Sequence, residues 1–77
     1  MDDTTINQLA YRIEHRPPGG DSAVVAAAAG LLAGARAFED AFLALAAAGQ
    51  RGTLALVCEL GDAAVPIATR LILPVAG

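Results

Sequence analysis

The sequence predicts a small α+β domain in which one long alanine-rich helix packs on a short sheet. Three observations lead to this fold class. The chain has only 77 residues, which is enough for one domain with one core. Clusters of glycine and proline at 17–20, 49–52 and 61–62 divide it into four segments. The outer segments alternate like strands, and the long segment between them has high helix propensity. The predicted order is β-α-β-β, with α-α-β-β as the alternative.

The first segment, 9–16, fits either a strand or the end of a helix. As a strand, its charged side chains fall at every second position and would all face solvent. As a helix, Thr5 and Gln8 would form a capping box at its start. The strand accounts better for the charges, so we expect a strand over 9–16 that follows a flexible N-terminus over 1–8. The helical alternative stays open.

The second segment, 22–49, predicts one long helix. Alanine is the best helix former, Asp21 or Ser22 offers an N-cap, and Gly49 is placed to end the helix. Such a helix would be about 40 Å long, whereas a domain of this size is about 30 Å across. We therefore expect the helix either to bend or to be covered at its end by another chain.

The last two segments, 53–60 and 64–73, predict the two strands of a hairpin that turns at Gly61. Leucine residues gather on one face of the first strand. Pro66 cannot donate a hydrogen bond to a neighbouring strand, so the second strand is expected to have a free edge. A right-handed crossover through the helix would place 9–16 parallel to 53–60.

The predicted helix carries a stripe of small residues that indicates an interface. Alanine and glycine along one side would let another helix approach closely. A narrow charged stripe beside them would set the register of such a contact. Replacing Gly34 by leucine is therefore expected to weaken association while the hairpin is retained. The predicted interface residues are Ala26, Gly30, Gly34, Ala37, Ala41, Ala44, Ala48, Arg36, Glu39 and Asp40.

Composition and charge narrow the choice of partner. The formal net charge is −3, and the chain contains no lysine and no tryptophan. Proteins that bind nucleic acid use basic patches or stacking aromatic side chains, so no nucleic-acid partner is expected. Hydrophobic residues make up 56% of the chain, which is more than a small monomer readily buries. The expected partner is a second copy of the chain or a larger protein.

Few residues of the sequence could carry chemistry. Cys58 and His15 are the single cysteine and the single histidine, so the chain offers no internal disulfide and no zinc-type cluster. We expect Cys58 to be a buried thiol and His15 to be solvated. No catalytic residue, cofactor or metal site is therefore predicted, and a non-enzymatic protein is favoured. The alternative is a small enzyme whose pocket forms between subunits and uses His15, Cys58 or an acidic residue.

A membrane-associated protein is a further alternative that the spacing of charges does not favour. A spanning helix needs about 20 consecutive apolar residues, and the uncharged run from Ala23 ends at Arg36. The acidic N-terminus lacks the features of a secretory signal, so a cytoplasmic location is expected. The sequence thus predicts a small interaction or oligomerisation module. Inhibitors, antitoxin-like partners, accessory subunits and assembly components of phage or other shells belong to this class.

Overall fold

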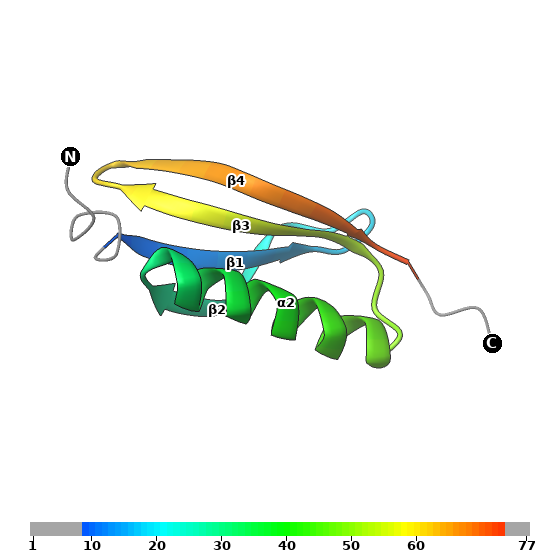
Figure 1. Ribbon diagram of the computed structural model, residues 1–77. Coiled ribbons are helices and arrows are strands. Elements are labelled where there is room, and N and C mark those ends of the chain that lie inside the picture. The colour runs from blue at the N-terminus through cyan, green and yellow to red at the C-terminus, as the bar shows by residue number, and fades with distance from the viewer. Residues whose placement is uncertain (1–8, 74–77) are drawn as a thin grey trace.

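A computed structural model describes residues 9–73 of the chain. It contains a four-stranded antiparallel sheet with one helix on one of its faces (Figure 1). The elements in chain order are β1 (Ala10–Arg16), β2 (Ala23–Ala29), α2 (Leu31–Ala47), β3 (Gly52–Leu60) and β4 (Ala63–Ile72). The α+β class and the order of strand, helix and two hairpin strands are confirmed, with β2 as an additional strand. The N-terminus predicted to be flexible, 1–8, lies outside the described residues.

The predicted helix 22–49 is wrong over its first part. Residues 23–29 form β2, and α2 extends only over Leu31–Ala47, which is 17 residues or about 26 Å. Gly30 separates the two elements with φ 91° and ψ 149°, a conformation that only glycine adopts readily. Alanine favours a helix only weakly, and tertiary contacts override such a preference. As a strand, this segment satisfies the backbone of β1, and the overhang that called for another chain does not exist.

The position of β2 also reverses the predicted direction of one strand pair. β1 and β3 lie at the centre of the sheet, whose order is β2-β1-β3-β4. They pair antiparallel, so the parallel pairing of 9–16 with 53–60 is wrong. The physical reason is that β2 first returns the chain to the beginning of β1. The helix then runs back along the sheet, and β3 enters beside β1 in the opposite direction.

The ends of α2 are defined by backbone geometry. Its C-terminal stop at Gly49 is confirmed, because Gly49 has φ 76° and the N–H of Gln50 donates to the carbonyl of Leu45 at 2.9 Å. The helix begins at Leu31, directly after β2, so neither Asp21 nor Ser22 caps it. No side chain caps it in their place.

The core lies between α2 and the sheet face that the helix covers. The leucine-rich face of β3 points toward the helix, as its alternation predicts. These β3 side chains pack beside those of β1 in the sheet, and α2 covers both. The buried members of this core are Tyr11, Ile13, Phe38, Leu54, Leu56, Cys58 and Ile72.

β4 presents Arg70 toward the helix and leaves Leu71 on the opposite face. Arg70 lies opposite the fully buried Leu54 in the sheet. Its Nη1 donates to Oε2 of Glu39 at 2.5 Å, and its guanidinium lies 3.6 Å from the ring centroid of Phe42. Leu71, the next residue, is left 63% exposed. The register of the hairpin therefore turns a charged side chain toward the helix, where it stays partly exposed, and leaves an apolar one on the other face.

Candidate interaction surface

Both edges of the sheet are apolar. β2 contains no charged residue, and the charged residue of β4 is Arg70, which is paired with Glu39. Native proteins usually protect an open edge with charge, proline or a bulge, because its free backbone groups can pair with another chain. The large hydrophobic side chains that are exposed on or directly after these strands are Val24, Val25, Val65, Ile67, Leu71 and Leu73.

The edge of β4 carries two such protective features. Pro66 has no backbone N–H to offer, and the register with β3 shifts between Leu56 and Val57. The expectation that Pro66 lies on a strand with a free edge is confirmed. These two interruptions lie close together and leave residues 68–72 as the regular part of β4.

The open edge of β2 presents the backbone of Ala27 and Ala29. The N–H of Gly30 donates to the carbonyl of Leu9 at 2.9 Å, which makes this a hydrogen-bonded pair. Hydrogen-bonded and non-hydrogen-bonded pairs alternate along antiparallel strands. Counting back from Gly30, every second residue therefore points its backbone groups toward β1, and Ala27 and Ala29 point theirs outward. Val25 is an extra residue where the register shifts, and it limits the regular edge to the second half of the strand.

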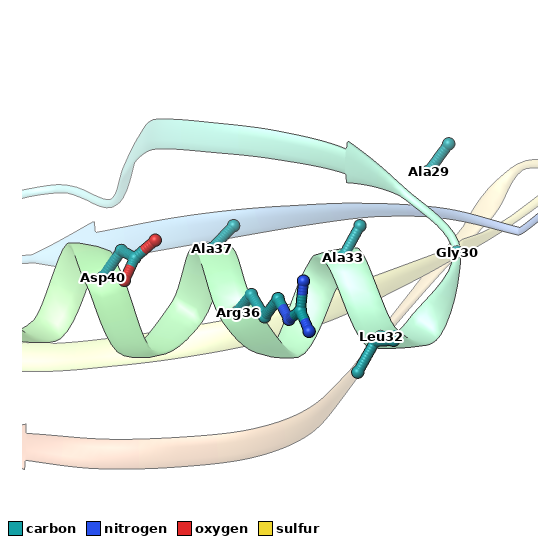
Figure 2. Close-up of a pocket in the computed structure, with 7 residues that line it drawn as sticks. All are labelled: Ala29, Gly30, Leu32, Ala33, Arg36, Ala37 and Asp40. Atoms are coloured by element: carbon teal, nitrogen blue, oxygen red, sulfur yellow. The ribbon is translucent and has the colours of Figure 1, made fainter.

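A groove of about 530 Å³ lies between the end of β2 and the flank of α2 (Figure 2). Arg36 and Asp40 stand on successive turns of the helix along this groove. The rest of its lining is small or apolar, and consists of Ala29, Gly30, Leu32, Ala33 and Ala37. The groove therefore combines an apolar floor with one positive and one negative side chain.

The predicted interface residues do not form one stripe on one helix. Ala26 lies in β2 and Gly30 at its end, so neither belongs to α2. Gly34 is buried against the sheet of its own chain, where a Cβ would lie 3.1 Å from Cβ and Cγ of Tyr11. Leucine at this position would displace the helix from the sheet. Gly34 therefore makes a contact within its own chain, and weaker association of the leucine variant with the hairpin retained stays a prediction.

The other predicted residues divide between the groove and three different surroundings. Arg36, Ala37 and Asp40 line the groove. Ala41 packs on the core, and Glu39 reaches across to β4 rather than pairing with Arg36. Ala44 and Ala48 are exposed. Together with Gly30, the structure thus brings four of the ten residues to the groove, and the sequence alone missed the strand edge that borders it.

The uncovered face of the sheet carries a charged cluster. Arg12 donates from Nε to Glu14 and from Nη1 to Oε1 of Glu59, the latter at 3.1 Å. The hydrogen bond with Glu14 contributes most to raising the pKa of Arg12 above its ordinary value, and Glu59 adds to it. Burying three charged groups against a partner costs desolvation energy. The edges are therefore better suited than this face to a close contact.

Cys58 and His15 do not meet. Both are buried on the helix-facing side of the sheet, but Cys58 lies opposite Tyr11, and His15 is four residues further along β1, or about 13 Å. The expectation of a buried Cys58 is confirmed. The expectation of a solvated His15 is wrong, because its Nε2 donates to the carbonyl oxygen of Arg51 at 2.8 Å and holds the ring inward. Alternation of 9–16 already contained this signal, since His15 shares a face with Tyr11.

Residues 9–73 contain no helix of the length and apolar character that crossing a bilayer requires. Within the same range, no three histidine, cysteine or acidic side chains gather as metal ligands. Comparison of the chain with protein-family models, with curated proteins and with solved structures finds no match.

Proposed function

We propose that this protein is a non-enzymatic interaction module that associates, through the edges of its sheet, with a second copy of itself or with a larger protein. The observation that carries this proposal is the pair of open, apolar edge strands. β2 has no charged side chain, and the one on β4, Arg70, is already bound to Glu39. Edges of this kind pair readily with another chain.

The distribution of hydrophobic side chains supports the same proposal. Among residues 9–73, eight hydrophobic residues are buried and ten large ones are exposed. Burying a fully exposed leucine or valine is worth about 1.5–3 kcal/mol, and covering one of these side chains, which are 41–67% exposed, adds about half of that. A partner that covers two or three of them would therefore add stabilisation comparable to much of the stability of a small domain, which is about 5 kcal/mol.

Roles of this kind include those of an inhibitor, an antitoxin-like partner, an accessory subunit and an assembly component of a shell. Each of these roles depends on a binding surface that contacts a partner, and none needs a set of catalytic residues. The proposal includes a cytoplasmic location, which a single buried thiol such as Cys58 fits.

Sedimentation and thermal unfolding test the proposal together. If folding is coupled to association, the melting temperature rises with protein concentration, because the associated state is favoured by mass action. Sedimentation over the same concentrations gives the molar mass of each species. A protein that sediments as a monomer, melts at the same temperature at every concentration and binds no other protein would contradict the proposal.

A further inference from the structure

We propose that the partner is a second copy of this chain, docked antiparallel along β2 and the groove side of α2 about a two-fold axis. This inference rests on the proposed function and names its partner. It joins three features of the structure that are otherwise unrelated: the open edge of β2, the groove, and the charge pair Arg36 and Asp40.

The charges of the groove are complementary to themselves. Arg36 and Asp40 lie one turn apart on the same flank of α2 (Figure 2), and neither forms an ion pair with another residue in the range 9–73. In a two-fold contact the same surface meets itself in opposite directions. Arg36 of each copy then faces Asp40 of the other, which gives two attractive pairs. A parallel contact would instead place like charges together.

One axis suits both the strand and the helix. An antiparallel β2–β2 pair centred on Ala27 uses its outward N–H and C=O in two hydrogen bonds between copies. Ala27 lies three residues before Gly30, or about 10 Å along the strand. The midpoint of Arg36 and Asp40 lies eight residues after Gly30, or about 12 Å along the helix. Because α2 runs back along β2 (Figure 2), an axis through Ala27 also passes between the two charged side chains.

The spacing between the helices is also compatible with close packing. α2 makes the most contacts with β2, and Gly34 packs on Tyr11 of β1. If adjacent strands are about 4.8 Å apart, a helix centred between β2 and β1 lies about 5 Å from the axis. The two helices are then about 10 Å apart, which is a normal distance for packed helices. Ala33 and Ala37 give the flank of each helix the small side chains that such a distance requires.

The opposite edge is less suitable for this contact, because its charged side chain, Arg70, is already paired with Glu39. Pro66 and the nearby register shift interrupt β4. The extra residue Val25 interrupts β2 as well, but it leaves Ala26–Ala29 regular beside the groove. The short strand contact and the helix contact therefore act together, and the product is an eight-stranded sheet with both helices on one face.

Charge reversal tests the helix contact. R36D places two aspartates opposite two aspartates, and D40R does the same with arginines, so each variant raises the dimer dissociation constant by about tenfold or more. The double variant R36D/D40R restores both attractive pairs and returns the constant to near the wild-type value. An equimolar mixture of the two single variants also associates, as a heterodimer with both pairs restored. R51D and D62R, which change exposed charges away from the groove, serve as controls for net charge.

Proline substitution tests the strand contact. A27P removes an outward N–H without removing a hydrogen bond to β1, so the monomer keeps its sheet while the dimer weakens by about tenfold or more. A27V keeps the N–H and is the control. Circular dichroism of each variant establishes that the monomer is folded before sedimentation equilibrium is measured.

The outcomes separate this inference from the function on which it rests. Rescue of association in the double variant and in the mixture supports the inference. If R36D, D40R and A27P each self-associate as tightly as the wild-type protein, this inference is overturned. The proposed function as an interaction module is then unaffected. A wild-type monomer that binds a different protein overturns the inference as well. A monomer that binds nothing overturns both.

Discussion

Gly34 of α2 lies directly against the side chain of Tyr11 in β1. A Cβ at position 34 would stand 3.1 Å from both Cβ and Cγ of Tyr11, which is tighter than an ordinary contact. The missing side chain therefore sets the distance at which the helix can approach the sheet. That distance in turn places the groove-facing flank of α2 beside β2. A residue predicted to lie at an interface between chains instead determines how the chain packs on itself.

Replacing Gly34 by leucine is expected to lower the free energy of unfolding by about 2 kcal/mol, since overpacking a close contact forces helix and sheet apart. A35L adds the same side chain at the neighbouring exposed position and should change stability by less than about 0.5 kcal/mol. Denaturant titration of the two variants measures both values. Equal stabilities for G34L and A35L would contradict the close contact with Tyr11.

Arg70 is expected to stabilise the hairpin against the helix more through Phe42 than through Glu39. The ion pair is largely exposed and should contribute about 0.5 kcal/mol, whereas stacking on Phe42 adds about 0.5–1 kcal/mol. E39Q should therefore cost less stability than R70A. Raising the salt concentration should remove most of the cost of E39Q, because salt screens exposed charges. A double-mutant cycle over Glu39 and Arg70 measures the coupling.

The thiol of Cys58 is expected to resist alkylation in the folded protein. It is 5% exposed and lies in the core opposite Tyr11. Modification then requires unfolding, so its rate should rise with denaturant in parallel with the unfolded fraction. Mass spectrometry after timed reaction with iodoacetamide measures the rate. Rapid modification without denaturant would show that Cys58 is accessible and would reopen a chemical role for it.

Tyr11 is expected to make the fold sensitive to high pH. Burial raises the pKa of Tyr11 above its ordinary value of 10.0, and the neighbouring Cys58 adds to this. The folded state therefore disfavours the ionised phenol. Its contribution to stability is complete below the unfolded pKa and is lost as pH rises above about 10 toward the folded pKa.

Y11F removes this titration while keeping the ring that fills the core. Its stability should therefore fall less steeply above pH 10 than that of the wild type. Urea titrations at several alkaline pH values compare the two slopes. Identical slopes would mean that Tyr11 is not the group responsible.

The helix pattern in 23–29 illustrates why part of the fold could not be predicted. Its five alanines and two valines favour a helix by local propensity, yet the segment is a strand that pairs with the otherwise open side of β1. The preference of alanine for helix is only a few tenths of a kcal/mol per residue over other good helix formers. Hydrogen bonds to β1 outweigh it. Gly30, whose φ of 91° separates strand from helix, was a local signal of the break.

The candidate surface shows the same division. The flank with Arg36 and Asp40 follows from helical spacing alone, and its small neighbour Ala37 was recognised with it. The pairing of Glu39 with Arg70 was not predicted, because it joins α2 and β4, and local sequence patterns do not show how these two elements pack. The edge of β2 could not be recognised either, since that strand was taken for helix.

The sequence by itself determined the α+β class, the end of the helix at Gly49 and the C-terminal hairpin, and it favoured the strand in 9–16. These features depend on alternation, on glycine and on short turns, which act between neighbouring residues. Only the tertiary structure decided that 23–29 is a strand, that Gly34 faces Tyr11 and that a groove lies beside an open edge. Those features depend on contacts between distant segments, whose energies exceed the local preferences of the residues that make them.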